Sequence, residues 1–584
     1  MFKVTSLNIQ GAVPPVKNKN KRMKRSIVFL LLLPQFMQAQ QLPEKHYPKG
    51  YFRNPMNIPI ELAGNFGELR PNHFHSGIDI KTQQRENLPV HAAAEGFVSR
   101  VGISHLGFGN VLYIDHPNGY TTVYAHLNRF YPKLEAYITS KQYEQESWAT
   151  NITLPAGLFP VKKGEFIAWS GNTGGSGGPH VHFEIRDTKT EKPVNPMLFG
   201  FSIPDTRKPE ISRIVVYDRN KSLYEQTPKV VTVKATKGGY VASTPVVKVA
   251  TDKVSLGLSA IDRQSNSPNP NGIYEAMLIE DGEINCGFQL DNIGYDETRY
   301  LNAHIDYKMR KGGGPYVQLL FSLPGNNLGV YHEVVGNGIV DLSDKQPHPV
   351  TLRVTDAYGN ASDVKLTLQQ SGDVVETPVC TNAMYPGSRN IFENSEVEFF
   401  LEEGSLYDDI CFRYQEIPNS KAYSNTFRLH TALVPVHHSF SLRIMPKRTV
   451  QPELQDKMVI VRKGFGEGIS AAVYEDGWYK GTFRDLGDFY LTADTISPRI
   501  TPLGGIRSGA NLSKASRIAF SMSDASGIKS YRAELDGKWL MFSRRGNVLS
   551  YKFDEHCPPG NHKLTLKVTD IVDNETTYIL TFKR

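Results

Sequence analysis

Residues 171–186 read Gly-Asn-Thr-Gly-Gly-Ser-Gly-Gly-Pro-His-Val-His-Phe-Glu-Ile-Arg, a glycine-rich turn that leads into an alternating strand. In a strand, residues i and i+2 face the same side, so His180 and His182 are predicted to share one face, with Glu184 below them. The glycine run has no following Lys-Ser/Thr pair, so it is not a phosphate-binding loop. An isolated His-x-His pair is more often an ordinary strand than a ligand pair, and its surroundings decide between the two.

The sequence on both sides of this stretch, from 57 to 200, alternates short apolar runs with turns marked by Gly and Pro. The runs that predict strands are 90–101, 110–116, 120–126, 165–170 and 180–186. They favour an antiparallel β domain. Residues 134–147, rich in Glu, Gln, Lys and Ala, predict a helix within a segment, 131–160, that is expected to be an inserted loop. This loop is either a wall of a substrate groove or a plain surface insertion.

A second chemical motif precedes these strands, His75-Ser76-Gly77-Ile78-Asp79. Catalytic zinc takes three protein ligands plus water, and imidazole nitrogens and carboxylate oxygens are among its usual ligands. The further ordered motifs are Glu95-Gly96, Gly109-Asn110, Ile114-Asp115-His116, Tyr124-Ala125-His126-Leu127 and Gly178-Pro179-His180-Val181-His182-Phe183-Glu184. Together they span roughly residues 65–199, and this stretch resembles the lysostaphin and LytM type of zinc endopeptidases, which cut peptidoglycan peptides.

The resemblance implies a role for five residues. His75, Asp79 and His182 are expected to bind one zinc ion, while His126 and His180 flank the catalytic water. Zinc can lower the pKa of bound water to about 7, and a neighbouring imidazole can take its proton and pass it to the leaving amine. The sequence does not rank the two flanking histidines. Glu184 either orients a ligand or is a partly exposed strand carboxylate.

The sequence after residue 200 contains an internal repeat. The matched residues are Asp205 with Asp494, Asp262 with Asp524, Asp356 with Asp570, and Asn360 with Asn574. The alternating strands and polar turns of both copies predict immunoglobulin-like β-sandwiches, an expanded one at 201–372 and a second at 494–584. Residues 373–493 are predicted to form a β-rich domain of unknown type. The expected fold class is therefore mainly β, an antiparallel peptidase domain followed by β-sandwich domains.

The N-terminus predicts export. Basic residues 21–25 precede the apolar run 27–33, a pattern typical of a signal peptide within an N-terminal extension at 1–39, with Met23 the expected true start and 40–56 a lead segment. The run is too short to remain a membrane anchor, so no stable membrane insertion is expected after cleavage.

A net charge of +7 over 584 residues is too dilute for a nucleic-acid partner. Of the four cysteines, Cys380 and Cys411 are the pair to test first for a disulfide.

The leading functional prediction is a zinc-dependent endopeptidase, periplasmic or secreted, that hydrolyses amide bonds in peptidoglycan peptide cross-links. Its expected partners are the peptide stems, with an envelope protein as a candidate partner of the C-terminal β domains. One alternative is a catalytically silent LytM-type activator of other wall hydrolases, a class that typically lacks metal ligands. The other is a secreted zinc peptidase that acts on proteins.

Overall fold

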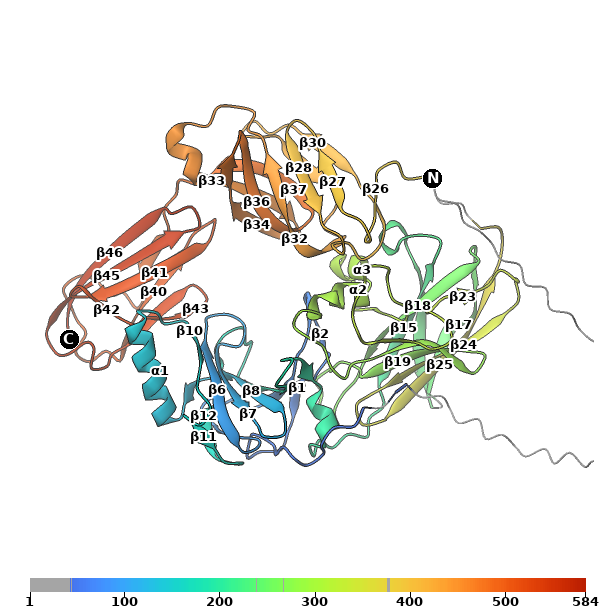
Figure 1. Cartoon of the computed structure of the whole chain (residues 1–584), viewed down its shortest axis with the longest axis horizontal. Coiled ribbons are helices and arrows are strands. Elements are labelled where there is room, and N and C mark those ends of the chain that lie inside the picture. The colour runs from blue at the N-terminus through green and yellow to red at the C-terminus, as the bar shows by residue number, and fades with distance from the viewer. Residues whose placement is uncertain (1–41, 44, 238, 266, 375–378) are drawn as a thin grey trace, which may run out of the picture. The chain divides into compact units, whose positions relative to one another are not determined.

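The structure, a computed structural model, describes residues 42–43, 45–237, 239–265, 267–374 and 379–584. The predicted signal peptide and the expected start at Met23 lie outside the described residues. Strands make up 46% of the structure and helices 7%, which confirms the mainly β fold class (Figure 1). Within the described part of the chain, no helix is long and apolar enough to cross a membrane.

The first part of the described chain holds an antiparallel sheet with strand order β1-β4-β13-β8-β7-β6-β10. Its strands are β1 (Leu62–Gly64), β4 (Ile78–Lys81), β6 (Gly96–Ile103), β7 (Asn110–Asp115), β8 (Tyr120–Leu127), β10 (Thr150–Thr153) and β13 (His180–Asp187), with β11 (Pro160–Val161) and β14 (Pro193–Val194) paired at its margins. The smaller sheets nearby consist of β2 (Leu69–Arg70) with β3 (His73–Phe74), and of β5 (Pro89–His91), β12 (Phe166–Trp169) and β9 (Arg129–Phe130).

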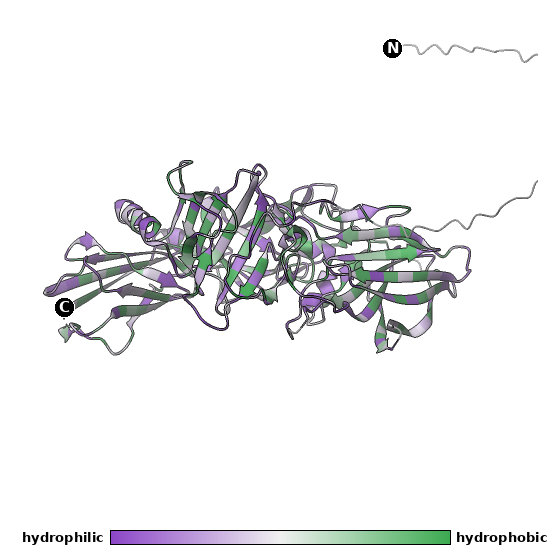
Figure 2. Ribbon diagram, turned by 90° about the horizontal axis from the view of Figure 1, so that it is seen from below, coloured by the Kyte–Doolittle hydropathy of each residue, from purple (hydrophilic) through white to green (hydrophobic). Residues whose placement is uncertain are grey.

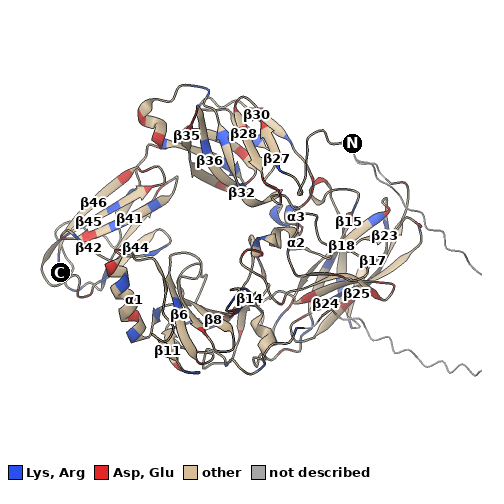
Figure 3. Ribbon diagram, in the orientation of Figure 1, with Lys and Arg blue, Asp and Glu red and all other residues tan. Residues whose placement is uncertain are grey.

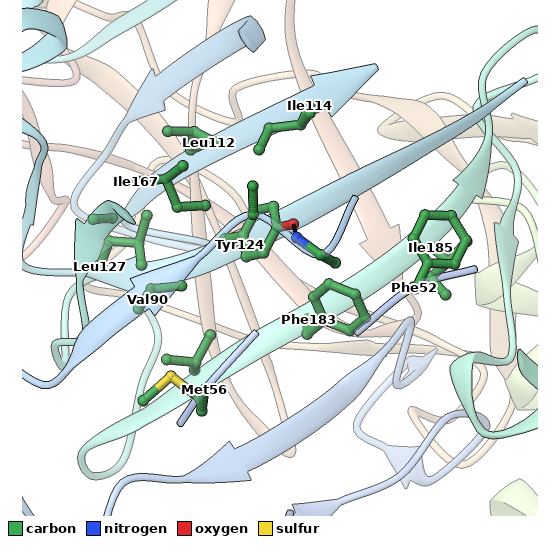
Figure 4. Close-up of a cluster of buried hydrophobic side chains, with 14 of the residues drawn as sticks. Phe52, Met56, Val90, Leu112, Ile114, Tyr124, Leu127, Ile167, Phe183 and Ile185 are labelled. Carbon is green, nitrogen blue, oxygen red and sulfur yellow. Dashed lines mark hydrogen bonds between the residues drawn. The ribbon is translucent and has the colours of Figure 1, made fainter. Parts of the chain in front are cut away.

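Alternation along these strands sends one set of side chains into a single core. Figure 4 shows that core, in which Phe183 and Ile185 of β13 lie with Tyr124 of β8, all three fully buried. The Tyr124 hydroxyl accepts a hydrogen bond from the backbone N–H of Ala93 at 2.7 Å, which satisfies its buried polar atom. Phe52, from the predicted lead segment, is buried in the same core. The alternation of polar and apolar residues along the strands is visible in Figure 2.

Two segments differ from the sequence-based expectation. The predicted strand 90–101 is two strands in different sheets, because the chain leaves β5 after His91 and re-enters the main sheet at Gly96. There the backbone of Asp115 passes so close that a Cβ on Gly96 would lie 2.1 Å from its carbonyl oxygen. The predicted helix is α1 (Pro132–Glu144), and the rest of the inserted segment adds β10 and β11 to the free edge of β6.

The next part of the chain, up to residue 372, carries a mixed sheet with the order β21-β18-β15-β16-β17-β25-β24-β19-β20-β22. Its elements are β15 (Glu210–Asp218), β16 (Lys229–Thr236), β17 (Gly239–Val249), β18 (Lys253–Ile261), β19 (Glu275–Glu280), β20 (Glu283–Gln289), α2 (Leu301–His304), α3 (Tyr307–Lys311), β21 (Gln318–Leu319), β22 (Tyr331–Glu333), β23 (Val340–Asp341), β24 (His348–Thr355) and β25 (Ala361–Gln370). The loop between β20 and α2 supplies a side chain to the site described below.

Residues 379–493 form a β-rich unit with two main sheets around one core. Its strands are β26 (Ala383–Met384), β27 (Asn390–Glu393), β28 (Val397–Leu401), β29 (Ile410–Cys411), β30 (Tyr414–Ile417), β31 (Thr426–Leu429), β32 (Pro435–Ile444), β33 (Met458–Gly464), β34 (Gly466–Ala471), β35 (Val473–Glu475), β36 (Trp478–Asp485) and β37 (Gly487–Ala493). Cys380 and Cys411 form a disulfide, which confirms the pairing chosen from the sequence.

The last 90 or so residues form two sheets that share a core, with orders β38-β40-β44-β43 and β39-β46-β45-β41-β42. Their strands are β38 (Arg499–Pro502), β39 (Ala510–Asn511), β40 (Arg517–Ser523), β41 (Ile528–Leu535), β42 (Lys538–Trp539), β43 (Ser543–Arg545), β44 (Val548–Lys552), β45 (Asn561–Asp570) and β46 (Glu575–Lys583). Basic and acidic residues are interspersed along the coloured ribbon, as Figure 3 shows.

Candidate metal centre

Strand pairing places three donor atoms at one point. In the register between β13 and β4, His182 lies directly opposite Asp79, and His75 enters from the turn just before β4. The Nδ1 atom of His182 is 2.9 Å from the Oδ1 atom of Asp79 and 2.9 Å from the Nε2 atom of His75. Asp79 Oδ1 and His75 Nε2 are themselves 3.1 Å apart. All three side chains are buried. The three residues predicted to bind zinc therefore converge.

The outer nitrogen of each imidazole is already occupied. His75 Nδ1 donates to the backbone oxygen of Asn65 at 2.8 Å, and His182 Nε2 donates to Glu184 Oε1 at 2.9 Å. With those tautomers, the inner nitrogens face each other at 2.9 Å with lone pairs that require a proton or a cation between them. Two nitrogens and one carboxylate oxygen are a donor set that suits zinc, and anchored outer nitrogens are usual for ligand histidines. The residues present therefore fit a zinc ion.

The second oxygen of Asp79 is held by a basic side chain that the sequence did not single out. Arg70, on β2, donates from Nη2 to Asp79 Oδ2 at 2.7 Å and lies 3.5 Å from Glu68. A Cβ on Gly64 would meet both Arg70 and Glu68 at 2.7 Å, so the absence of a side chain there lets this pair pack against Asp79. Arg70 thus fixes the carboxylate and leaves Oδ1 toward the two imidazoles.

The two histidines predicted to handle protons lie beside the donor set. The ring centroids of His126 and His180 are 4.7 Å apart, and His180 Nε2 is 3.4 Å from Asp79 Oδ1. His126 Nδ1 donates to the backbone oxygen of Thr173 at 2.8 Å, and His180 Nδ1 donates to that of Gly178 at 2.8 Å. Both rings therefore turn Nε2 away from the backbone. His126 also has a left-handed backbone, φ 59°, which is unusual for a residue other than glycine.

Four donors surround the buried carboxylate of Glu184. Besides His182, they are Ser76 Oγ at 2.5 Å, Arg186 Nε at 2.6 Å and the Tyr295 hydroxyl at 2.7 Å. Glu184 is fully buried, so of the two sequence-based interpretations the structure favours the one in which it orients a ligand. Tyr295 comes from the loop after β20, about 110 residues downstream, and it also receives a hydrogen bond from Arg186 Nη2 at 3.0 Å.

These contacts shift the pKa values of the centre. Burial opposes charge on Glu184 and Asp79, but Arg186 and His182 lower the pKa of Glu184, and His75 together with hydrogen bonds lowers that of Asp79. Although burial opposes a charged imidazole, hydrogen bonds to Asp79 and Glu184 raise the pKa of His182 to about 9. A cation on Nδ1 would replace that proton, because ligand histidines bind metals in the neutral form. Burial, then the neighbouring His182 and His180, lower the pKa of His126 to about 3.

Other histidines of this part of the chain lie outside the donor set. His73 is exposed and contacts the backbone oxygen of Pro71. His116 is buried between the backbone oxygen of Glu95 and the hydroxyl of Thr122, each at 2.7 Å, so its role is structural. The residues missed by sequence reasoning are Asn65, Arg70, Ser76, Arg186 and Tyr295. Ser76 and Arg186 adjoin the recognised motifs, whereas nothing in the sequence signals Tyr295.

A cavity of about 500 Å³ lies on the Arg186 side of this network. Its lining includes Arg100, Phe108, Tyr113, Arg186 and Tyr295. The Phe108 ring also contacts His182, with centroids 5.1 Å apart, so this aromatic ring separates the cavity from a predicted ligand.

Comparisons with known proteins match two parts of the chain. The model of peptidase family M23 matches residues 73–143, and a Zu5-like domain model matches 381–494, where the sequence predicted a β-rich domain of unknown type. The chain is 34% identical over 162 residues to the DD-carboxypeptidase/endopeptidase Mpg of Neisseria meningitidis serogroup B, and this aligned stretch covers 27% of this chain and 31% of that protein. It is 28% identical over 157 residues to lysostaphin of Staphylococcus simulans, covering 26% of this chain and 25% of that protein.

Among solved structures, the catalytic domain of the prophage-encoded M23 protein EnpA from Enterococcus faecalis is 26% identical, with a TM-score of 0.19, and the match covers 25% of this chain and 96% of that one. The chain spans about a third or less of the length of the two curated relatives named above. The family resemblance inferred from the motifs is confirmed at the level of the domain. The chain contains a peptidase family M23 domain of the lysostaphin and LytM type.

Proposed function

We propose that the M23 domain is a zinc-dependent endopeptidase that hydrolyses amide bonds in the peptide cross-links of peptidoglycan, and that the protein acts after export, in the periplasm or outside the cell. The observation that carries the proposal is the convergence of His75 Nε2, His182 Nδ1 and Asp79 Oδ1 within 3.1 Å of one another. The peptidase names of the curated relatives support the same class of reaction.

Each residue of the centre has a task that follows from its contacts. His75, Asp79 and His182 would hold the zinc ion, while Asn65, Arg70 and Glu184 fix the three ligands from outside. When bound, zinc lowers the pKa of water to about 7 and polarises a carbonyl group.

The two flanking histidines would move protons at Nε2. His126 and His180 are each anchored through Nδ1 to a backbone oxygen, so Nε2 is the nitrogen that faces away from the backbone, and that of His180 lies 3.4 Å from Asp79 Oδ1. A neutral imidazole there can accept a proton from the attacking water and, as the imidazolium so formed, return that proton to the oxyanion or to the leaving amine. The two rings differ in their surroundings, since His180 Nε2 lies 3.4 Å from Asp79 Oδ1 and His126 is the more deeply buried ring, and we propose that they share the acceptance and the return of this proton.

The intact site favours an enzyme over a silent activator. A wall-hydrolase activator does not need metal ligands, whereas here all three ligands and both flanking histidines are retained and anchored by further hydrogen bonds. Holding several polar groups in a buried cluster opposes folding unless each is satisfied. A site maintained in this detail supports a catalytic use of it.

The test is digestion of isolated peptidoglycan sacculi by purified residues 40–584, with released muropeptides identified by mass spectrometry and bound zinc measured by atomic spectrometry. We expect loss of cross-linked dimers and one zinc per chain. His182→Ala should abolish both. His91→Gln is the matched control, because His91 belongs to the same domain but contacts Asn57 and Gly164 instead of the centre. Zinc-loaded protein that leaves every muropeptide unchanged would refute the proposal, and cleavage of casein but not of sacculi would identify a peptidase that acts on proteins.

A further inference from the structure

The internal repeat brings three aspartates together in each copy. In the first, carboxylate oxygens of Asp205, Asp262 and Asp356 lie within 4.8 Å of one another. In the second, those of Asp494, Asp524 and Asp570 do the same. These are the aspartates that the sequence repeat aligned, so the acidic cluster is the feature that the two copies share. We call them the first and the second aspartate triad.

Each triad joins the segment that enters a repeat to the ends of two strands. Asp205 precedes β15, Asp262 follows β18 and Asp356 follows β24. The second copy repeats this arrangement, with Asp494 before β38, Asp524 after β40 and Asp570 at the end of β45. The shared placement follows from the fold of the repeat and not from a local acidic run.

The hydrogen bonds of the third aspartate are also the same in both copies. Asp356 accepts the backbone N–H of Asn360 at 2.9 Å through Oδ1 and the Asn360 amide at 2.7 Å through Oδ2. Asp570 accepts from Asn574 at 2.8 and 2.7 Å in the same way. Each asparagine also donates to the backbone oxygen of the first aspartate, Asp205 at 3.5 Å and Asp494 at 3.0 Å. The carboxylate of the third aspartate is therefore held in place in both copies before any ligand binds.

Buried oxygens at the first triad lack a partner. Asp262 is 2% exposed, and its Oδ1 has no hydrogen-bond donor among the described residues. Asn271 pairs with Asp262 in an antiparallel bridge, so the two side chains project to the same face, and Asn271 Oδ1, also buried, has no donor within the described structure. At the second triad, Oδ2 of Asp494 is also buried and has no hydrogen-bond donor among the described residues. Acceptor oxygens in such a state call for a cation or a proton.

No side chain neutralises the triads. Among the described residues, no lysine or arginine forms an ion pair with any of the six carboxylates. The basic groups nearest in sequence to the first triad, Arg207 and Arg263, both pair with Glu210 instead. Burial, followed by the charges of Asp356 and Asp205, raises the pKa of Asp262 to about 7, which is the cost of leaving the carboxylates together without a cation.

We propose that each aspartate triad binds one Ca²⁺ ion, so that the chain carries two calcium sites in addition to the zinc centre. Calcium takes six to eight oxygen ligands in flexible geometry, and carboxylates, amide oxygens and waters are its usual donors. The triads contain no imidazole or thiolate, which separates them from the zinc centre in chemistry. Each ion would tie the entering segment to two strand ends and so stiffen the repeat where it joins the preceding domain.

The test uses the full chain with its zinc centre loaded, in calcium-free buffer, titrated with CaCl₂ to 10 mM by isothermal titration calorimetry. We expect two ions per chain, with dissociation constants at or below the 10⁻⁴ to 10⁻³ M range of extracellular modules. Asp262→Asn and Asp524→Asn should each leave one ion, and the double variant none. Glu555→Gln is the matched control, since it alters an exposed acidic cluster and should leave both sites intact.

Thermal unfolding gives a second measurement, which remains informative if a variant is too unstable for calorimetry. Calcium should raise the Tm of the wild type but not that of the double variant, because only the folded repeats bind the ion. Without calcium, Asp262→Asn should be at least as stable as the wild type, since it removes like-charge repulsion. Absence of calcium binding up to 10 mM would overturn the proposal. So would binding that persists in the double variant, or equal affinity for Mg²⁺.

Discussion

Removal of the Tyr295 hydroxyl is the most direct test of how the proposed zinc centre is supported. Tyr295→Phe keeps the ring and deletes only the hydroxyl, which donates to Glu184 at 2.7 Å, lies 3.0 Å from Ser76 Oγ and accepts from Arg186 at 3.0 Å. A hydrogen bond to a charged group contributes about 1.5–3 kcal/mol. Because three other donors still hold Glu184, we expect the lower end, about 1.5 kcal/mol, in the free energy of unfolding.

The effect on the metal passes through His182. Glu184 loses part of its anchoring, so the imidazole that it orients becomes less well placed, and loss of such a partner typically costs 10- to 100-fold in metal affinity or activity. We expect about a tenfold weaker zinc affinity, equivalent to about 1.4 kcal/mol. Competition with a chromophoric chelator measures the affinity, and urea unfolding measures the stability.

Tyr113→Phe is the matched control, since that ring also faces Arg186, at 5.3 Å, but its hydroxyl is not one of the four donors to Glu184. It should change zinc affinity less than twofold. If Tyr295→Phe binds zinc as tightly as the wild type while Glu184→Gln does not, the role assigned to the hydroxyl is wrong.

Three further perturbations test other parts of the structure. Arg70→Met removes the donor to Asp79 Oδ2, so zinc affinity should fall by roughly tenfold in the same chelator assay, and an unchanged affinity would contradict the role given to Arg70. In Gly174→Ala the new Cβ would lie 2.3 Å from the backbone nitrogen of Gly109, and residue 174 has a φ of +69° that disfavours alanine. Because the carbonyl of the neighbouring Thr173 anchors His126, activity on sacculi should drop at least tenfold while zinc binding is retained. Gly177→Ala, with nothing within 4 Å, is the control that should be silent. Burial lowers the pKa of His304 to about 3 from an unfolded value near 6.5, so the unfolded chain binds the extra proton between these values and stability falls as pH falls. His304→Gln should remove about 1.6 kcal/mol of the stability that urea unfolding shows to be lost between pH 6.5 and pH 5, and equal slopes in both proteins would reject this assignment.

Local patterns in the sequence identify most of the domain and its centre. Alternation of apolar residues predicts the strands 110–116, 120–126 and 180–186, because burial on one face of a sheet imposes a period of two. The spacing of His180 and His182 and the ordered motifs around them identify all five central residues. The split of 90–101 into β5 and β6 was not predictable, since an uninterrupted apolar run does not show that its two ends pair with different sheets.

The sequence by itself determined the residue types of the proposed zinc centre and the repeat that aligns the six aspartates, because both are encoded in motifs of fixed order. Only the tertiary structure decided what surrounds them. The register of β13 on β4 sets His182 opposite Asp79, Arg70 and Tyr295 reach the ligands from separate segments, and strand ends far apart in the chain bring each aspartate triad together. Such contacts depend on which strands pair and in which register, and long-range pairing leaves no periodic signal in the sequence.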